Sequence, residues 1–397
     1  MKSLDNNGKT LTQSREVLDK SVIDRYAQGA IEREDALCCP VDYDPKYLKI
    51  IPEEIIAKDY GCGDPSQYVN EGETVLDLGS GGGKICYIAS QKVGAKGKVI
   101  GVDFNPTMLN LARKYKDEMA EKIGWGNVEF KRGAIQDLKT DMDFLDKQLA
   151  GKEVKSSDDF LALQSEVKAL VEENPMIPSN SVDVIVSNCV LNLVGNVEKK
   201  QLFEEMFRVT KRGGRVAISD IVSDEVVPQE LQDDEYLWSG CISGAFEEKA
   251  FVKAFEDAGF YGVEIVKRDE KPWQTVKGIE FRSVTIIAYK GKEGPCLERN
   301  QAVIYKGPWK QVLDDDGHYL KRGAHTAVCD KTFNIYSKAP YNQDIIPVPP
   351  IKDIPLDKAE EFDCSRSAER DPRETKGVEY DKTTEAEDCC GPEESCC

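Results

Sequence analysis

Cysteine is the residue type in this 397-residue chain with the most unusual chemistry, because thirteen cysteines occur beside only two histidines, His318 and His325. So few imidazoles argue against a Ser-His-Asp triad and against histidine acid–base catalysis. An odd number of cysteines leaves at least one thiol unpaired in any disulfide scheme, and no C-x-x-C spacing supports a zinc ribbon or a thioredoxin-type motif. The thiols are therefore expected to be buried apolar groups, ligands of soft metals, or redox groups.

Three cysteines lie far apart in the sequence, in short segments that suit a binding site. Cys62 follows a tyrosine-glycine pair in Y-G-C-G, Cys189 follows an apolar strand in S-N-C-V, and Cys241 lies in W-S-G-C. Ligands of open α/β sheets bind at the carboxyl ends of strands, so Cys189 is expected to face a ligand crevice. Each cysteine alone could be a small buried hydrophobic residue. Together, the three thiols could converge above a sheet and hold one soft, polarisable centre.

A glycine-rich turn follows the first apolar strand that we expect, residues 74–78. It reads D-L-G-S-G-G-G and begins at Asp77. The dinucleotide fingerprint G-x-G-x-x-G fails in either register, because its last position is not glycine. Asp103 ends the next expected strand, 103 − 83 = 20 residues after Gly83, where an acid can bind the hydroxyls of a ribose. The pattern favours a nucleoside cofactor without a pyrophosphate.

Apolar strands and amphipathic helices alternate from residue 74 onward. Strands are expected at 74–78, 98–102, 128–132, 182–187, 215–219, 263–267 and 283–289, and helices at 17–33, 50–59, 84–93, 106–123, 197–210 and 247–259. This order predicts an α/β fold, with a parallel sheet covered by helices on both faces. A charged, helical insertion at 138–178 interrupts the alternation.

Changes in composition divide the chain further. We expect an N-terminal segment with a cysteine pair, a cofactor-binding domain, a region that completes the sheet, a C-terminal domain and an acidic, cysteine-rich disordered tail. Their bounds are 1–48, 49–221, 222–290, 291–360 and 361–397.

Charge and hydropathy exclude two classes of partner. The chain has 53 basic and 72 acidic residues and a formal net charge of −19, which repels nucleic-acid backbones and anionic membrane surfaces. No apolar stretch approaches the ~20 residues of a membrane span, and the first residues lack the apolar segment of a secretory signal. We therefore expect a cytoplasmic protein with neither nucleic acid nor membrane as a partner.

Four motifs carry a resemblance to known enzymes. D-x-G-x-G-x-G at 77–83 resembles the first motif of class I S-adenosylmethionine methyltransferases. Y-x-C-G at 60–63, S-N-C-V-x-N-L at 187–193 and W-x-x-C-x-x-G-A at 238–245 resemble motifs of the arsenite S-adenosylmethionine methyltransferases. The resemblance runs from about Cys38 to Lys290, apart from the insertion. It implies a Rossmann-like sheet with an antiparallel last strand and a smaller C-terminal domain.

The resemblance also implies residue roles. In that family, cysteines matching Cys62, Cys189 and Cys241 bind trivalent arsenic, and one matching Cys38 or Cys39 can pair with the one matching Cys62. The residues expected to contact S-adenosylmethionine are Tyr60, Asp77, Gly79, Gly81, Asp103, Phe104, Ile135 and Asn188. The expected substrate is arsenite or its glutathione conjugate, with glutathione or thioredoxin as the thiol reductant. Three thiolates around arsenic leave a lone pair free, and this nucleophile carries no proton, so the chemistry requires no general base.

Two other functions remain open on the sequence alone. A methyltransferase for a small organic acceptor explains the glycine turn and Asp103, but it leaves the three cysteine motifs without a purpose. A thiol-rich protein that sequesters arsenic or heavy metals explains the cysteines, but it leaves the cofactor groove without a purpose. The favoured function is methyl transfer to thiolate-bound arsenic, as in arsenic detoxification.

Overall fold

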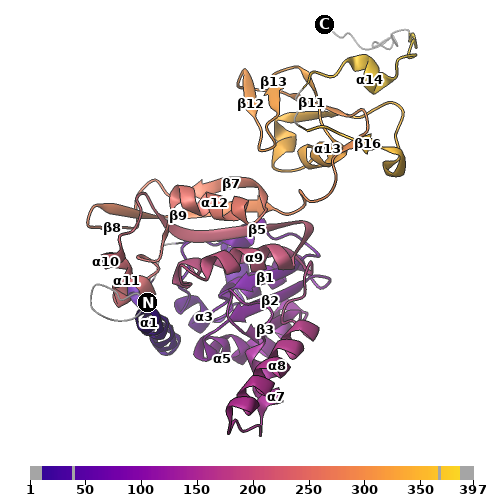
Figure 1. Ribbon diagram of the computed structural model, residues 1–397. Helices are drawn as coiled ribbons and strands as arrows, with labels where there is room; N and C mark the ends of the chain where they lie inside the picture. Colours follow the sequence, from indigo (N-terminus) through magenta and orange to yellow (C-terminus); the bar gives the residue numbers. More distant parts are fainter. Residues whose placement is uncertain (1–10, 38–40, 365–367, 385–397) are drawn as a thin grey trace. The chain divides into compact units, whose positions relative to one another are not determined.

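The computed structural model describes residues 11–37, 41–364 and 368–384. The chain divides after Gly291 into two compact units. The first contains a mixed sheet covered by helices, and the second is a smaller domain built mainly from short strands (Figure 1). Among the described helices, none is both long enough and apolar enough to cross a lipid bilayer.

The sheet of the first unit has the strand order β3-β2-β1-β4-β5-β9-β7, with β6 paired to β5 and β8 to β9. Its strands are β1 (Thr74–Leu78), β2 (Lys98–Asp103), β3 (Val128–Arg132), β4 (Val182–Asn188), β5 (Thr210–Ser223), β6 (Phe246–Glu247), β7 (Tyr261–Arg268), β8 (Gln274–Val276) and β9 (Ile279–Tyr289). Strands β1 to β5 run parallel, whereas β9 is antiparallel to β5 and β7. The predicted α/β sheet with an antiparallel last strand is confirmed.

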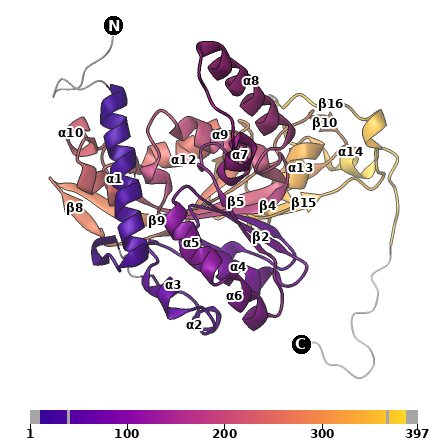
Figure 2. The same cartoon turned by 90° about the horizontal axis from the view of Figure 1, so that it is seen from below.

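Helices cover both faces of this sheet (Figure 2). They are α1 (Leu11–Ile31), α2 (Pro45–Leu48), α3 (Glu53–Ala57), α4 (Lys84–Val93), α5 (Pro106–Lys114), α6 (Lys116–Ile123), α9 (Lys199–Val209), α10 (Gln229–Gln232), α11 (Glu235–Ser239) and α12 (Glu248–Asp257). Strand β1 shows why two layers form: Val75 is buried in the core with α4 to α6, and Leu76 is buried in the core with α9 and α12. A strand that is apolar on both faces requires such a cover on each side.

Two local predictions were wrong. The helix predicted at 106–123 is broken at Tyr115, whose φ is −101° and whose amide bonds to Ala112, so α5 ends and α6 begins. The strand predicted to start at residue 215 starts at Thr210. It starts early because Gly213 and Gly214 exchange backbone hydrogen bonds with Lys290, a partner too distant in sequence for local patterns to indicate.

The insertion is helical, as predicted, and consists of α7 (Met142–Leu149) and α8 (Ser157–Glu173). Helix α7 is attached to the domain, because Leu145 is buried and Asp143 pairs with Arg113 at 2.6 Å. None of the seventeen residues of α8, all of which are described, is buried.

The second unit has its own hydrophobic core, centred on Val303, Val328 and Tyr336. Its elements are β10 (Leu297–Glu298), β11 (Ala302–Tyr305), β12 (Gln311–Leu313), β13 (Tyr319–Lys321), β14 (His325–Ala327), α13 (Asp330–Tyr336), β15 (Ile345–Val348), β16 (Glu360–Glu361) and α14 (Pro372–Lys376). It continues past the predicted start of a disordered tail at residue 361, because the buried Arg370 bonds to Glu298 at 2.8 Å. The end of the tail, 385–397, lies outside the described residues.

Candidate active site

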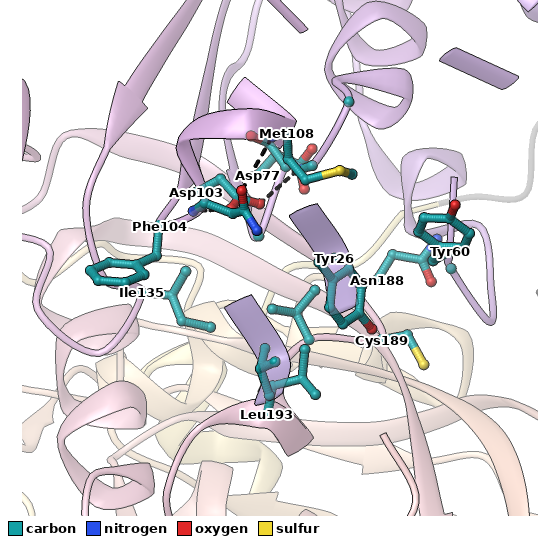
Figure 3. A pocket seen from close by; sticks show the side chains of 18 of the residues that line it. Tyr26, Tyr60, Asp77, Asp103, Phe104, Met108, Ile135, Asn188, Cys189 and Leu193 are labelled. Atoms are coloured by element: carbon teal, nitrogen blue, oxygen red, sulfur yellow. Dashed lines mark hydrogen bonds between the residues drawn. The ribbon is translucent and has the colours of Figure 1, made fainter. Parts of the chain in front are cut away.

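A cavity of about 330 Å³ opens at the carboxyl ends of β1, β2 and β4. All eight residues predicted to contact the cofactor line it. In Figure 3, Phe104 and Ile135 lie on one side, and Tyr26, Asn188 and Cys189 lie on the opposite side. The cavity therefore has an apolar end and an end that reaches one of the predicted arsenic ligands.

The turn after β1 forms part of the cavity wall through its backbone. Gly79 has a φ of 72°, and a Cβ there would lie 2.6 Å from Cγ2 of Val190. Only glycine combines this left-handed conformation with so close a neighbour. Gly81, at a φ of 50°, donates its amide to Oδ2 of Asp103 at 2.8 Å. The turn and the acid after it are thus one hydrogen-bonded structure.

The two predicted carboxylates differ in their surroundings. Asp103 accepts backbone hydrogen bonds on both oxygens, from Gly81 and Asn105. Burial raises the pKa of Asp103, although these amides oppose the shift. Asp77 is buried, and burial raises its pKa to about 7, with the charges of Asp59 and Asp103 adding to the effect and a bond from Cys86 opposing it. A cationic ligand would therefore stabilise the ionised form of Asp77.

Cys62, Cys189 and Cys241 meet in one buried apolar cluster with Ile221 and Phe281. The Cys189 thiol interacts with the thiols of both other cysteines, and Cys241 Sγ donates to the carbonyl of Cys189 at 3.0 Å. Among the described residues, the three sulfurs are not all within 4.8 Å of one another. The trio is therefore assembled by the fold, and side-chain movement is needed to close it around one small centre.

Two of these cysteines have a strained backbone. Cys189 has a φ of 63° and Cys241 a φ of 61°, a left-handed conformation that is unfavourable for residues other than glycine and that costs about 1–3 kcal/mol. The Cys189 amide donates to the carbonyl of Ser219 at 2.8 Å, and the carbonyl of Cys241 accepts a hydrogen bond from Nδ2 of Asn192 at 3.2 Å. Strain of this kind persists where the surroundings fix it, and it concentrates at functional sites.

The backbone of Cys62 is held on both sides of the residue. The amides of Cys62 and Gly63 donate to Oδ1 of Asn188 at 2.9 and 3.0 Å, and the hydroxyl of Ser283 donates to the Cys62 carbonyl. Asn188, predicted only as a cofactor contact, thus also connects β4 to the loop that carries Cys62.

The surroundings of Cys62 and Cys189 disfavour ionisation of their thiols. Burial is the main cause that raises the pKa of Cys62, and the nearby Asp220 adds to it. The pKa of Cys189 is raised by its interactions with Cys241 and Cys62 as well as by burial. Asp220 is itself buried, which raises its pKa to about 7.

Comparisons with known proteins were consistent with this geometry. A family model described as a methyltransferase domain matches residues 69–259, and one described as a domain of unknown function matches 292–380. The arsenite methyltransferase of Aquipseudomonas alcaligenes is 30% identical over 327 residues, which cover 78% of this chain and 84% of that protein. The arsenite methyltransferase of Homo sapiens is 30% identical over 379 residues, with 88% of each chain covered. This chain belongs to the arsenite methyltransferase family.

A solved structure agrees with this assignment to the arsenite methyltransferase family. The arsenic(III) S-adenosylmethionine methyltransferase from Chlamydomonas reinhardtii is 26% identical and superposes with a TM-score of 0.54, covering 82% of this chain and 100% of that one. The fold is therefore that of a class I methyltransferase, extended by a C-terminal domain.

The sequence motifs did not indicate every residue of the site, and Tyr26 is an example close to the thiols. Tyr26, from α1, lines the cavity, and its hydroxyl lies 3.6 Å from Sγ of Cys241. Its ring packs edge-to-face on Tyr60, whose hydroxyl donates to Gly29 and accepts from the amide of Glu34. No motif surrounds Tyr26, so its role depends on tertiary packing. Cys38 and Cys39 lie outside the described residues.

Proposed function

We propose that this member of the arsenite methyltransferase family methylates trivalent arsenic bound by Cys62, Cys189 and Cys241, with S-adenosylmethionine as the methyl donor. The observation that carries the proposal is the double position of Cys189, which belongs to the buried thiol cluster and also lines the cavity. A ligand in the cavity and a centre bound by the thiols would thus be neighbours.

The residues of the cavity fit S-adenosylmethionine. Ser80 lines the cavity with a buried hydroxyl that has no hydrogen-bond partner among the described residues. Asp103 keeps unused lone pairs for ribose hydroxyls, because each carboxylate oxygen can accept more than one bond. Asp77 suits the ammonium group of the methionyl end, and Phe104 with Ile135 suits the adenine. When bound, this cofactor supplies an electrophilic methyl group on a positively charged sulfur.

Three buried thiols suit arsenous acid as the substrate. Each As–OH group can exchange for an As–S bond with release of water, so As(OH)₃ and three thiols give a neutral As(S-Cys)₃ and three waters. No charge has to be buried in this exchange, which matters because an isolated ion is costly in an apolar cluster. Soft sulfur ligands also favour this soft centre.

The chain contributes mainly by positioning the reactants. The thiol trio fixes the direction of the arsenic lone pair, and this nucleophile needs no proton removed from it. Alignment of two reactants can be worth roughly 7–11 kcal/mol. Tyr60 and Tyr26 line the cavity beside the cysteines, where their rings exclude water and can attract a cation.

A thiol reductant completes the proposed cycle. When the arsenic lone pair forms an As–C bond, arsenic passes formally from the trivalent to the pentavalent state. Two electrons from a pair of thiols return it to the trivalent state and leave a disulfide. We assign these electrons to Cys62 with Cys38 or Cys39, and to glutathione or thioredoxin, which would reduce the disulfide again. The paired cysteines of the tail, at 389–390 and 396–397, could capture arsenic for delivery.

The two alternatives explain less. A small organic acceptor would leave the three thiols beside the cavity without use, and a sequestering protein would not need a cavity with this set of polar groups. Incubation with arsenite, isotopically labelled S-adenosylmethionine and glutathione separates the three. Labelled methylarsenicals support the proposal, whereas arsenic binding without turnover, or no reaction with arsenic, would count against it.

Serine variants test the residue assignment. Cys189→Ser and Cys241→Ser should abolish every methylation step, and Cys62→Ser should at least stop the first one. Cys86→Ser is the matched control, because this buried thiol lies outside the trio and a serine hydroxyl can still donate to Asp77. Full methylation by Cys189→Ser would overturn the proposal.

A further inference from the structure

A second group of three thiols lies within the C-terminal unit. The sulfurs of Cys296, Cys329 and Cys364 are all within 4.8 Å of one another. Among the described residues, no other group of three or more histidine, cysteine, aspartate or glutamate side chains has its ligand atoms this close together. The proposed methylation mechanism uses none of these cysteines.

Three separate segments of the unit bring these thiols together. Strands β10 and β16 pair antiparallel, and the amide of Phe362, just after β16, donates to the carbonyl of Cys296, just before β10, at 2.9 Å. This pairing brings Cys296 close to the segment that leads from β16 to Cys364. Cys329 precedes α13 and is fully buried, and its sulfur accepts a hydrogen bond from the amide of Thr332 at 3.4 Å. The cluster is therefore built by the fold of this unit.

The cluster combines a buried base with access from solvent. Cys296 and Cys364 are partly exposed, so a small solute can reach them, whereas Cys329 forms the buried base. Burial opposes ionisation of Cys296, but bonds from Cys364 and Cys329 and the charge of Lys331 lower its pKa overall. Burial and the bond with Cys296 raise the pKa of Cys364, so the geometry of the three sulfurs, not their ionisation, supports the site.

We propose that Cys296, Cys329 and Cys364 bind one trivalent arsenic, at a site separate from the one where arsenic is methylated. The choice of ligand follows from the number of donors. Structural zinc takes four protein ligands in a tetrahedron, but within the described part of the chain no histidine, aspartate or glutamate joins the three sulfurs. Trivalent arsenic needs three ligands and places a lone pair in the fourth direction.

Binding of arsenic at this site requires no oxidant or reductant. Arsenous acid exchanges three hydroxyls for three sulfurs, three thiol protons leave in three waters, and arsenic stays trivalent. The site would hold arsenic in addition to the molecule at the methylation site. The proposal rests on the proposed function only in that arsenite is the substrate of the enzyme.

The test uses the full-length chain without its other candidate thiols. In a background that carries Cys38→Ser, Cys39→Ser, Cys62→Ser, Cys189→Ser, Cys241→Ser and serine at the four tail cysteines, the protein is reduced with a phosphine and titrated with arsenite. Bound arsenic is measured by mass spectrometry and its neighbours by X-ray absorption. We expect one arsenic per chain with three sulfur neighbours. Adding Cys296→Ser or Cys364→Ser should weaken binding by roughly 100-fold, as expected when one of several linked donors is lost.

Controls separate this proposal from its rivals. Cys86→Ser in the same background should leave arsenic binding unchanged, and circular dichroism should show that each variant is folded. Stoichiometric arsenic in both Cys296→Ser and Cys364→Ser, a tightly bound zinc that arsenite does not displace, or no arsenic binding would each overturn the proposal. Methylation by the unaltered chain is assayed separately, so the failure of one proposal is distinguishable from the failure of the other.

Discussion

Asn188 holds the loop of Cys62 in place, since its Oδ1 accepts the amides of Cys62 and the following glycine while its Nδ2 donates to the carbonyl of Gly63 at 2.7 Å. The next residue after Asn188 is Cys189. One asparagine thus fixes the relative positions of two proposed arsenic ligands, although 189 − 62 = 127 residues separate them in the chain. This relationship makes the cluster sensitive to changes that touch no thiol.

Asn188→Ala should weaken arsenic binding more than cofactor binding. The substitution leaves two buried amides without their acceptor, which costs about 1–3 kcal/mol of stability each time such a group is left unpaired. We expect the KM for arsenite to rise at least about tenfold, which corresponds to roughly 1.4 kcal/mol, and the melting temperature to fall. Steady-state kinetics with each substrate varied in turn measures the difference.

Asn196→Ala, on the exposed surface, is the control for Asn188→Ala. A larger effect on the KM for S-adenosylmethionine would show that Asn188 acts mainly on the cofactor.

Gly61→Ala should have a similar effect for a steric reason. A Cβ at Gly61 would lie 2.5 Å from Cγ of Asn188, and the side chain of Asn188 cannot move away without breaking its hydrogen bonds. Overpacking of this kind typically costs about 1–3 kcal/mol. Denaturant unfolding and the arsenite KM should both report the change. Gly126→Ala, where the nearest atom is 3.4 Å away, should be neutral, and equal behaviour of the two variants would contradict the clash.

The position of Cys189 could be predicted from sequence because local patterns determine it. The apolar run before it indicated a strand buried on both faces, and a parallel sheet aligns the carboxyl ends of its strands around a crevice. The same argument predicted Asp77 and Asp103 at the cavity. Repeating strand and helix patterns, read at short range, were thus sufficient for the alternation of strands and helices in a parallel sheet and for one end of the site.

Tyr26 could not be predicted in this way. It reaches the cavity because α1 packs against α11, where Arg25 donates to the carbonyl of Tyr236 at 2.9 Å. The two residues are 211 positions apart, and no local pattern marks either one. Cys241 was predicted as a site residue from its motif, but its left-handed backbone after α11, which depends on contacts from Asn192, was not. Long-range packing of irregular segments therefore determines the part of the site that sequence reasoning missed.

Binding of S-adenosylmethionine should strengthen as the pH rises from 6 to 8. Burial raises the pKa of Asp77 to about 7, so this carboxyl is mostly protonated at pH 6 and mostly ionised at pH 8. A positively charged ligand prefers the ionised form, and two pH units across this pKa should lower the dissociation constant by up to about tenfold. Calorimetry without arsenite measures it. Asp77→Asn should flatten the profile, whereas Asp220→Asn, which lies outside the cavity wall, should not.

Two substitutions at Tyr60 separate the roles of its ring and its hydroxyl. Tyr60→Phe keeps a ring that can attract a sulfonium but loses the bonds to Gly29 and Glu34. We expect its KM for S-adenosylmethionine to change little, while hydrogen exchange in the second half of α1 becomes faster. Tyr60→Ala loses both functions, and loss of a cation–π contact of about 1–2 kcal/mol should raise that KM by roughly five- to thirtyfold.

The control for Tyr60 is a tyrosine with the same kind of bond elsewhere. Tyr87 donates its hydroxyl to the carbonyl of Ala112 at 2.7 Å and does not line the cavity. Tyr87→Phe should cost about 1 kcal/mol of stability and leave the cofactor KM unchanged. If Tyr60→Phe raised that KM as much as Tyr60→Ala does, the hydroxyl rather than the ring would be the important group.

Removing α8 should leave the enzyme active. This helix buries none of its residues, whereas α7 before it anchors the insertion through Leu145. Replacing residues 150–173 with a short glycine-serine linker therefore removes little apolar contact, and linkers of this kind add only a small closure cost. We expect kcat/KM to stay within about threefold and the free energy of unfolding within about 1 kcal/mol. Leu145→Ala is the contrasting variant, because truncating a buried leucine costs about 2–5 kcal/mol. If the deletion were the more damaging of the two, α8 would have to contribute through a contact that its exposure in this fold does not provide.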